Sequence, residues 1–189
     1  MRSKAKLDKP EAILKAMLTL VVERGFHNAP MSVLAKKAGV SVGIIYHYFP
    51  SKEELITAVY QRVRSIKRAA LLEGYTADSD PKRALIQVWM NAYGFYRDHP
   101  KETRFLDQYE SSPFACIPSP KGDADPIPRE IQKRFRSRKR GGILNDMPPE
   151  VVQELTFGLA SRLAKKPKTL SRAALKAVAE KIWRAISED

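Results

Sequence analysis

The sequence contains one cysteine, Cys116, and only three histidines, His27, His47 and His99. A single cysteine cannot form a disulfide within the chain, and the histidines lack the close spacing of zinc ligands. We therefore expect neither a disulfide-stabilised fold nor a metal site, and nothing in the composition calls for a cofactor.

Apolar runs of the roughly 20 residues needed to span a bilayer are also missing, and the N-terminus lacks the hydrophobic stretch of a secretory signal. These absences predict a cytoplasmic protein without membrane contact. Catalytic patterns are equally scarce, because no phosphate-binding glycine loop, Ser/His/Asp order or paired acid and base can be assembled from these residues. We do not expect an enzyme.

Positive charge is what the chain has in excess. The formal net charge is +13, and residues 1–72 hold 13 Lys and Arg against 5 Asp and Glu, whereas residues 73–189 hold 21 against 16. A basic region of this kind favours a polyanionic partner such as DNA. Basic side chains that only keep the protein soluble are the alternative.

Apolar residues recur at spacings of three and four residues between short stretches of turn residues, and no alternating strand pattern is found. The hydrophobic fraction of 43% is typical of a globular protein. The sequence thus predicts an all-α fold of about nine helices. The polar stretch 73–80 is the predicted boundary between a domain at 1–55, extended by a connecting helix to about 72, and a second domain at 73–189.

Capping signals divide the first 72 residues into four helices. Gly25 and Gly39 are placed to end the first and second helices, because glycine adopts positive φ without strain. Ser32, Ser41 and Ser51 are predicted to cap the second, third and fourth. Two short helices joined by a tight turn are typical of a helix-turn-helix, which binds duplex DNA.

Proline and glycine mark the helices of the second half in the same way. The stretch between Pro113 and Pro128 is too rich in proline for regular structure and is predicted to be a loop. Helices are predicted to start at Pro81, Lys101, Arg129, Pro149 and, with Ser171 as the cap, in the last twenty residues.

The first part of the chain carries a dense motif, made of Gly25-Phe26, Leu34 to Ser41, Gly43, and Ile45 to Leu55. In these residues the chain resembles the tetracycline-repressor (TetR) family over roughly residues 9 to 60. The resemblance implies an N-terminal three-helix DNA-binding domain and a C-terminal helical domain for ligand binding and dimerisation. It implies a sequence-specific transcriptional regulator, a homodimeric repressor that a small-molecule effector releases from a palindromic DNA operator. A non-sensing DNA-binding or architectural protein with the same fold is the alternative.

The candidate DNA contacts lie in or beside the third helix and are Ser32, Val42, Gly43, Ile44, Tyr46, His47, Tyr48 and Lys52. Gly43 would let the backbone approach the groove closely, unless it is only a helix-start glycine. The resemblance implies phosphate contacts from Tyr46 and from position 47 or 48. Tyr48 alternatively packs in the core, where Ile45 and Phe49 are expected.

Ile44 departs from the family pattern, which often has a small hydroxylated residue at this position. Val42 and Ile44 offer only apolar contact, for example to a thymine methyl group, and cannot donate to guanine. Base discrimination would therefore depend on apolar contact, on DNA deformability and on a basic N-terminal arm with Arg2, Lys4 and Lys6.

Three lysines within the motif are further candidates for electrostatic contact with DNA. Lys52 is predicted to bind phosphate, because its ammonium stands at the positive N-terminal end of a helix. Ser32 would contribute similarly at the second helix, although simple capping explains it equally well. Lys36 and Lys37 would add nonspecific attraction or be ordinary solvated lysines.

The second domain is predicted to hold the effector pocket, and its candidate lining residues are the aromatics Trp89, Tyr93, Tyr96, Phe105, Tyr109 and Phe114. Aromatic stripes at helical spacing also fill ordinary cores, so both interpretations stay open. Asp107, Gln108 and Glu110 would orient a polar or cationic ligand, or form a solvated face.

The dimer interface is assigned by resemblance to the last two helices, with Leu155, Leu159, Leu163, Ile182, Trp183 and Ile186 as its candidates. The same apolar stripes would serve an intramolecular core. The basic cluster from Lys133 to Arg140 would attract an anionic effector or a second stretch of DNA, or form an exposed helix end.

Overall fold

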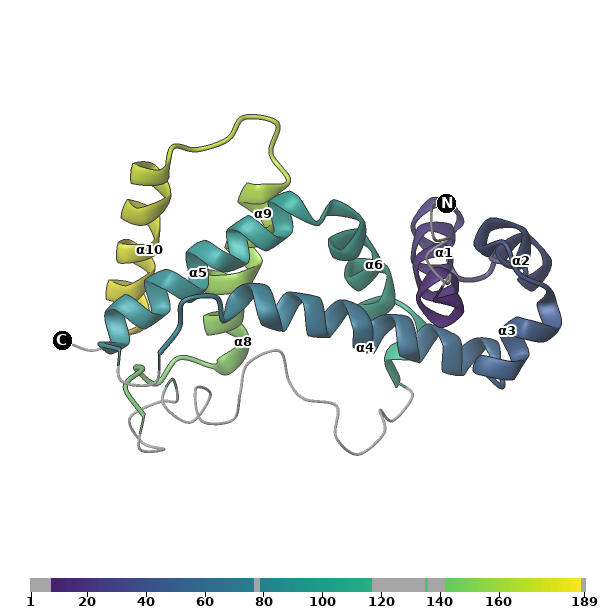
Figure 1. Ribbon diagram of the computed structural model, residues 1–189. Helices are drawn as coiled ribbons and strands as arrows, with labels where there is room; N and C mark the ends of the chain where they lie inside the picture. Colours follow the sequence, from purple (N-terminus) through teal and green to yellow (C-terminus); the bar gives the residue numbers. More distant parts are fainter. Residues whose placement is uncertain (1–7, 77–78, 117–134, 136–141, 188–189) are drawn as a thin grey trace. The chain divides into compact units, whose positions relative to one another are not determined.

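The computed structural model describes residues 8–76, 79–116, 135 and 142–187 (Figure 1). No strand occurs in these ranges, where Leu144 and Ser187 form an isolated bridge. The predicted all-α fold is confirmed. Its helices are α1 (Lys9–Arg24), α2 (Met31–Ala38), α3 (Val42–Tyr48), α4 (Lys52–Leu71), α5 (Pro81–Asp98), α6 (Pro100–Glu110), the short 3-10 helix η1 (Pro113–Cys116), α8 (Pro149–Gln153), the π-helical turn η3 (Glu154–Gly158), α9 (Leu159–Ala164) and α10 (Arg172–Ile186).

The helices form two compact units. The first consists of the described residues of Met1–Arg64 and Pro100–Asp123, and the second of those of Ser65–His99 and Ala124–Asp189. α4 contributes to both units. α6 and η1 follow the predicted domain boundary in sequence, and yet they belong to the first unit.

α1 is central to the first unit, because α2, α3 and α6 all pack against it (Figure 1). Its apolar residues recur every three or four positions, which places Ile13, Met17 and Val21 on one fully buried face. Asp8 caps its start by accepting a hydrogen bond from the Glu11 backbone N–H. The helix ends at Gly25 as predicted, with φ of 77°.

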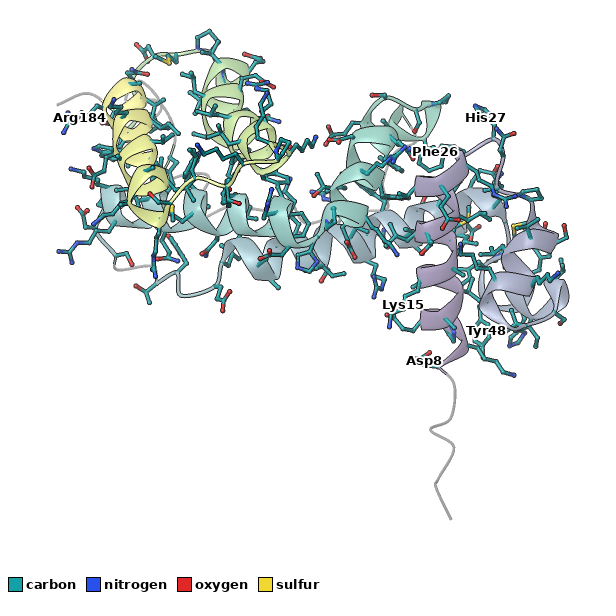
Figure 2. The ribbon with its side chains drawn as sticks, turned by 90° about the horizontal axis from the view of Figure 1, so that it is seen from above. Asp8, Lys15, Phe26, His27, Tyr48 and Arg184 are labelled. Carbon is teal, nitrogen blue, oxygen red and sulfur yellow. The ribbon has the colours of Figure 1, made fainter. Side chains whose placement is uncertain are left out.

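An aromatic cluster attaches α6 and η1 to this unit. The ring of Phe26, which follows α1 (Figure 2), lies 5.7 Å from Phe105, 6.3 Å from Tyr109 and 5.0 Å from Phe114, measured between ring centroids. Tyr60 of α4 stacks on Tyr109 at 4.0 Å. These aromatic contacts explain why α6 packs with the helices of the motif.

α5 is the centre of the second unit, and α9 and α10 both pack against it (Figure 1). Trp89 is 1% exposed, and its indole N–H donates to the carbonyl of Thr156 at 3.1 Å. Thr156 lies in η3, the π-helical turn that interrupts the helix predicted to start at Pro149. The bonded carbonyl thus ties α5 to this turn.

Side chains of α5 also bind the ends of other helices in the second unit. Asn91 donates to the carbonyls of Leu71 and Glu73, at 3.1 and 2.8 Å, where α4 ends. Arg97 donates to the carbonyls of Ala164 and Lys166, at 3.1 and 2.9 Å, where α9 ends. Both side chains donate to carbonyls at the last residue of a helix or two residues beyond it, where intrahelical N–H partners run out.

One predicted cap is wrong. α2 begins at Met31, its N-cap position is Pro30, and no side chain caps it, so Ser32 falls inside the first turn of the helix. The serine caps of two later helices are confirmed, because Ser51 accepts from the Glu54 N–H at 3.0 Å and Ser171 from the Ala174 N–H at 3.2 Å. Only Phe135 of the predicted helix from Arg129 to Arg140 is described; the basic cluster of that helix and the arm residues Arg2, Lys4 and Lys6 lie outside the described residues.

Candidate nucleic-acid interface

The turn between α2 and α3 has the predicted chemistry. Gly39 ends α2 with φ of 69°, in the left-handed region that glycine adopts without steric cost. The Val40 N–H then donates to the carbonyl of Ala35 at 3.0 Å, which closes the end of the helix. Ser41 caps α3 by accepting from the Ile44 N–H at 3.3 Å. Backbone geometry therefore sets the direction in which α3 leaves α2.

The inner face of α3 is apolar. Ile45 is fully buried and Phe49, just beyond the helix, is half-buried, as the sequence predicts. α3 packs against α1 and α2. Val42 and Ile44 are half-buried beside this inner face. These contacts attach α3 to α1 and α2 of the first unit.

The opposite face of α3 consists of exposed side chains. Tyr46 and Tyr48 are 46% and 41% exposed, although both are large enough to fill a core. His47 is exposed as well, and its ring contacts that of Tyr48 (labelled in Figure 2) with 5.1 Å between centroids. The structure thus places Tyr48 at the surface rather than in the core, and it brings the predicted contacts of α3 together on one side.

Gly43 lies on this exposed side with open space around it. A Cβ atom added there would meet only the Ser41 hydroxyl oxygen, at 3.9 Å, which is an ordinary van der Waals distance. Its φ is not positive, so the backbone does not need glycine either. Glycine in a helix costs about 0.5–1 kcal/mol relative to alanine. Neither packing nor backbone conformation within the first unit explains this residue.

Lys52 is engaged by the protein itself. Its ammonium donates to the carbonyl of Phe26 at 2.7 Å, and its side chain is partly buried. This bond joins the start of α4 to the segment after α1. An ammonium carries three N–H donors, so this contact leaves others for a phosphate. The bond could not be predicted from the sequence, because 26 residues separate its partners.

The lysines of α2 differ from each other. Lys37 forms an ion pair with Glu23 at 2.8 Å, and the hydrogen bond from Lys37 lowers the pKa of that carboxyl. Lys36 is exposed and forms no ion pair within the described residues. Ser32 is exposed in the first turn of α2. Of the two lysines, Lys36 is the better candidate for long-range attraction.

An ion pair that the sequence did not indicate joins α4 to α1. The Arg62 guanidinium donates to both carboxylate oxygens of Glu11, with Nε 2.9 Å from Oε2. The hydrogen bond from Arg62, supported by Lys15, lowers the pKa of Glu11, and burial opposes it. Glu11 in turn raises the pKa of Arg62. A bidentate pair fixes orientation as well as distance, so Arg62 orients α4 on α1.

The aromatic candidates for an effector pocket divide between the two units. Trp89, Tyr93 and Tyr96 are buried on α5 in the second unit. Phe105 and Tyr109 are buried on α6 in the first unit, within the cluster around Phe26. The remaining candidates lie on the first unit too, with Asp107 and Glu110 exposed and Phe114 and Gln108 half-buried. Packing accounts for Trp89, Phe105 and Tyr109.

The candidates for the dimer interface also divide, by exposure. Ile182 and Ile186 are 6% and 0% exposed and belong to the core of the second unit, which is the intramolecular alternative that the sequence left open. The other four are half-buried and keep part of their surface accessible. They are Leu155 in η3, Leu159 and Leu163 on α9, and Trp183 on α10.

The described residues contain no group of three or more His, Cys, Asp or Glu side chains able to hold a metal ion. None of the helices in the same ranges is both long and apolar enough to cross a membrane. The feature that stands out is α3, a short helix that is packed on one face and exposed on the other. A short helix that follows another helix across a tight turn and leaves one face exposed defines the class of helix-turn-helix DNA-binding proteins.

Comparisons with known proteins identify the family within this class. Residues 13–59 match the bacterial regulatory proteins of the TetR family, and residues 83–187 match the Tetracyclin repressor-like C-terminal domain. An HTH-type transcriptional regulator of Haemophilus influenzae is 30% identical over 189 residues, which covers 97% of this chain and 98% of the relative. The chain belongs to the TetR family of transcriptional regulators.

Solved structures agree with this assignment. A TetR-family transcriptional regulator from Vibrio parahaemolyticus is 28% identical with a TM-score of 0.75, covering 96% of this chain and all of that one. A TetR-family regulator from Marinobacter aquaeolei has a TM-score of 0.85 at 18% identity, with 96% of each chain covered, which supports the fold alone. The protein is therefore a DNA-binding transcriptional regulator.

Proposed function

We propose that this regulator is a repressor that binds a palindromic operator as a homodimer through the exposed face of α3. The observation that carries the proposal is the combination of that face with Gly43, a helical glycine that the fold does not require. Close approach of the helix backbone to the floor of the major groove supplies the missing reason, because a side chain at that position would hold the helix away.

The phosphate contacts are assigned to the side chains at the margins of this face. Tyr46 and Tyr48 carry exposed hydroxyl groups that can donate to phosphate oxygens. Lys36 adds a long-range attraction, and Lys52 adds the N–H groups that Phe26 does not use. Ser32, in the first turn of α2, stands beside backbone N–H groups that favour an anion.

Selection of operators from a random pool of duplexes tests this proposal with the full chain. Two copies of α3 read two half-sites whose centres are about 34–36 Å apart, one turn of DNA. We expect an enriched palindrome with that spacing. A pool without any enriched symmetric site, at low salt as well as at physiological salt, would count decisively against operator binding.

The homodimer is proposed to form through the half-buried apolar residues of α9, η3 and α10. Trp183 is the largest of them, and the exposed Arg184 beside it in sequence serves as a matched control. Trp183→Glu should convert the dimer to a monomer in sedimentation, whereas Arg184→Ala should not. A dimer that survives Trp183→Glu with unchanged affinity would exclude this helix face as the interface.

Release by a small-molecule effector bound in the second unit completes the proposed function. The candidates for lining its pocket there are Trp89, Tyr93 and Tyr96. A ligand that binds only the folded protein raises its melting temperature. A library of small metabolites should therefore contain a compound that raises Tm and also weakens operator binding. The non-sensing alternative predicts no such compound, and the hydrogen bond from Trp89 to Thr156 agrees with the packing role that this alternative gives to Trp89.

A further inference from the structure

The outermost line of α3 is formed by two residues, Gly43 and His47. Each residue of an α-helix is rotated by about 100° from the one before it, and Ile45, fully buried, marks the inward direction. Gly43 and His47 stand two positions before and two after Ile45, so each lies within about 20° of the opposite direction. They are four residues apart, and hence neighbours on the same face of the helix.

The two exposed tyrosines lie to the sides of this line. Counted in the same way, Tyr46 lies about 100° from Ile45 on one side and Tyr48 about 60° from it on the other. Their rings extend along the flanks of α3, where the phosphates border a groove occupied by a helix. Since glycine has no side chain, His47 is the one residue of α3 that places a side chain on the outermost line of the helix.

The composition of α3 leaves little else to recognise bases by hydrogen bonds. The helix reads Val-Gly-Ile-Ile-Tyr-His-Tyr and contains no Arg, Lys, Asn or Gln, the residues that most often contact guanine or adenine edges. His47 is its only residue with side-chain N–H donors. Its ring contacts Tyr48 edge to face, and its nitrogens make no hydrogen bond within the described residues.

We propose that His47 determines base specificity by donating a hydrogen bond to a guanine in each half-site, with Gly43 providing the close approach that this short side chain needs. The assignment rests on the proposed insertion of α3 into the major groove. Guanine is the base that fits best, because its major-groove edge has two acceptors, N7 and O6. Adenine has a donor beside its acceptor, cytosine has only a donor, and thymine has a single acceptor beside a methyl group. Val42 and Ile44 are left with apolar contacts to thymine methyl groups.

This role differs from the phosphate contact that the sequence suggested for His47. A phosphate contact weakens binding to all sequences alike, whereas a base contact changes which sequence is preferred. One experiment therefore distinguishes the two roles, even though the loss of either kind of contact lowers the affinity for DNA.

The test is operator selection with the full-length protein and with His47→Ala, followed by binding assays on the selected site. We expect His47→Ala to lose the preference for guanine at one symmetric pair of positions, and to bind the parent site about tenfold more weakly. Replacing that guanine by 7-deazaguanine, which lacks the N7 acceptor, should weaken the unmodified protein and leave His47→Ala unaffected. Lys36→Ala is the matched control, since it should weaken all sites and keep the base preference.

Two results would overturn the assignment. If His47→Ala keeps the selected sequence, weakens every duplex equally and reduces the salt slope by about one, then His47 contacts phosphate. If 7-deazaguanine weakens both proteins equally, N7 of the guanine has a partner other than His47. His47 is exposed, so the melting temperature of His47→Ala should match that of the parent and exclude misfolding as the cause. Failure of the unmodified protein to select any palindrome would instead remove the proposed function itself, and this assignment with it.

Discussion

The two compact units differ in what their side chains are used for. In the first, α3 keeps two tyrosines and a histidine exposed and a glycine without structural need, while the aromatic residues of α6 are buried behind α1. In the second, the large aromatics of α5 are buried, and the indole N–H of Trp89 is bonded to Thr156 of η3. Exposed residues of core type point to a binding function, whereas burial of the same residue types is what packing alone would produce.

The largest effect is expected from the core of the second unit. Trp89→Ala removes a ring that is 1% exposed and leaves the Thr156 carbonyl without its donor, which should lower the free energy of unfolding by about 3–5 kcal/mol. Urea unfolding measures the loss. Trp183→Ala, at a half-buried position, should cost less than half as much, and equal losses would contradict the packing role given to Trp89.

The position of α6 is tested next, because it decides where the first unit ends. Phe105→Ala empties a fully buried site against Phe26 and should also cost about 3–5 kcal/mol. Phe105→Ala should accelerate hydrogen exchange more in α1 than in α10, since α6 packs on α1. Faster exchange confined to α5 and α10 would place α6 with the second unit instead.

A smaller effect is expected from the ion pair between Arg62 and Glu11. Arg62→Met should lower stability by about 0.5–1 kcal/mol, reduced by the partial exposure of both side chains. The pKa of Glu11 is lowered in the folded state from its usual value of 4.5. The ion pair therefore contributes its full stabilisation above pH 4.5, and this stabilisation is lost as the pH falls through the lowered pKa of Glu11 in the folded protein.

Urea unfolding between pH 7 and pH 3 measures this contribution. The parent and Arg62→Met should differ at pH 7 and converge at the acid end. Lys15→Met is the matched control, because Lys15 pairs with the same carboxylate from an exposed position and should change stability very little. A difference that persists unchanged to pH 3 would show that Arg62 acts through packing rather than through its charge.

The local elements of the first unit could be predicted because single residues specify them. Gly25 and Gly39 end helices at positive φ, and Ser41 caps α3, as their sequence positions indicated. Ser32 misled for a similar local reason, because Pro30 occupies the N-cap position and α2 starts two residues earlier than predicted. Short-range signals of this kind act within one helical turn.

Contacts between distant residues could not be predicted from one sequence. The bond from Lys52 to the Phe26 carbonyl, the pair of Arg62 with Glu11 and the stacking of Tyr60 on Tyr109 join residues 26 to 51 positions apart. For the same reason, periodicity did not distinguish buried Ile182 and Ile186 from the half-buried Trp183. An apolar stripe predicts burial but not the surface that provides it.

The most direct test of the central claim, that the exposed face of α3 binds DNA, compares two glycine substitutions. Gly43 and Gly94 are both helical, and an added Cβ would meet no close neighbour at either position. Gly43→Ala and Gly94→Ala should each leave the protein as stable as before or more stable by about 0.5–1 kcal/mol. Operator affinity, measured at a single salt concentration, should fall at least tenfold for Gly43→Ala and stay unchanged for Gly94→Ala. Unchanged affinity in a folded Gly43→Ala protein would contradict the close approach of α3 to DNA.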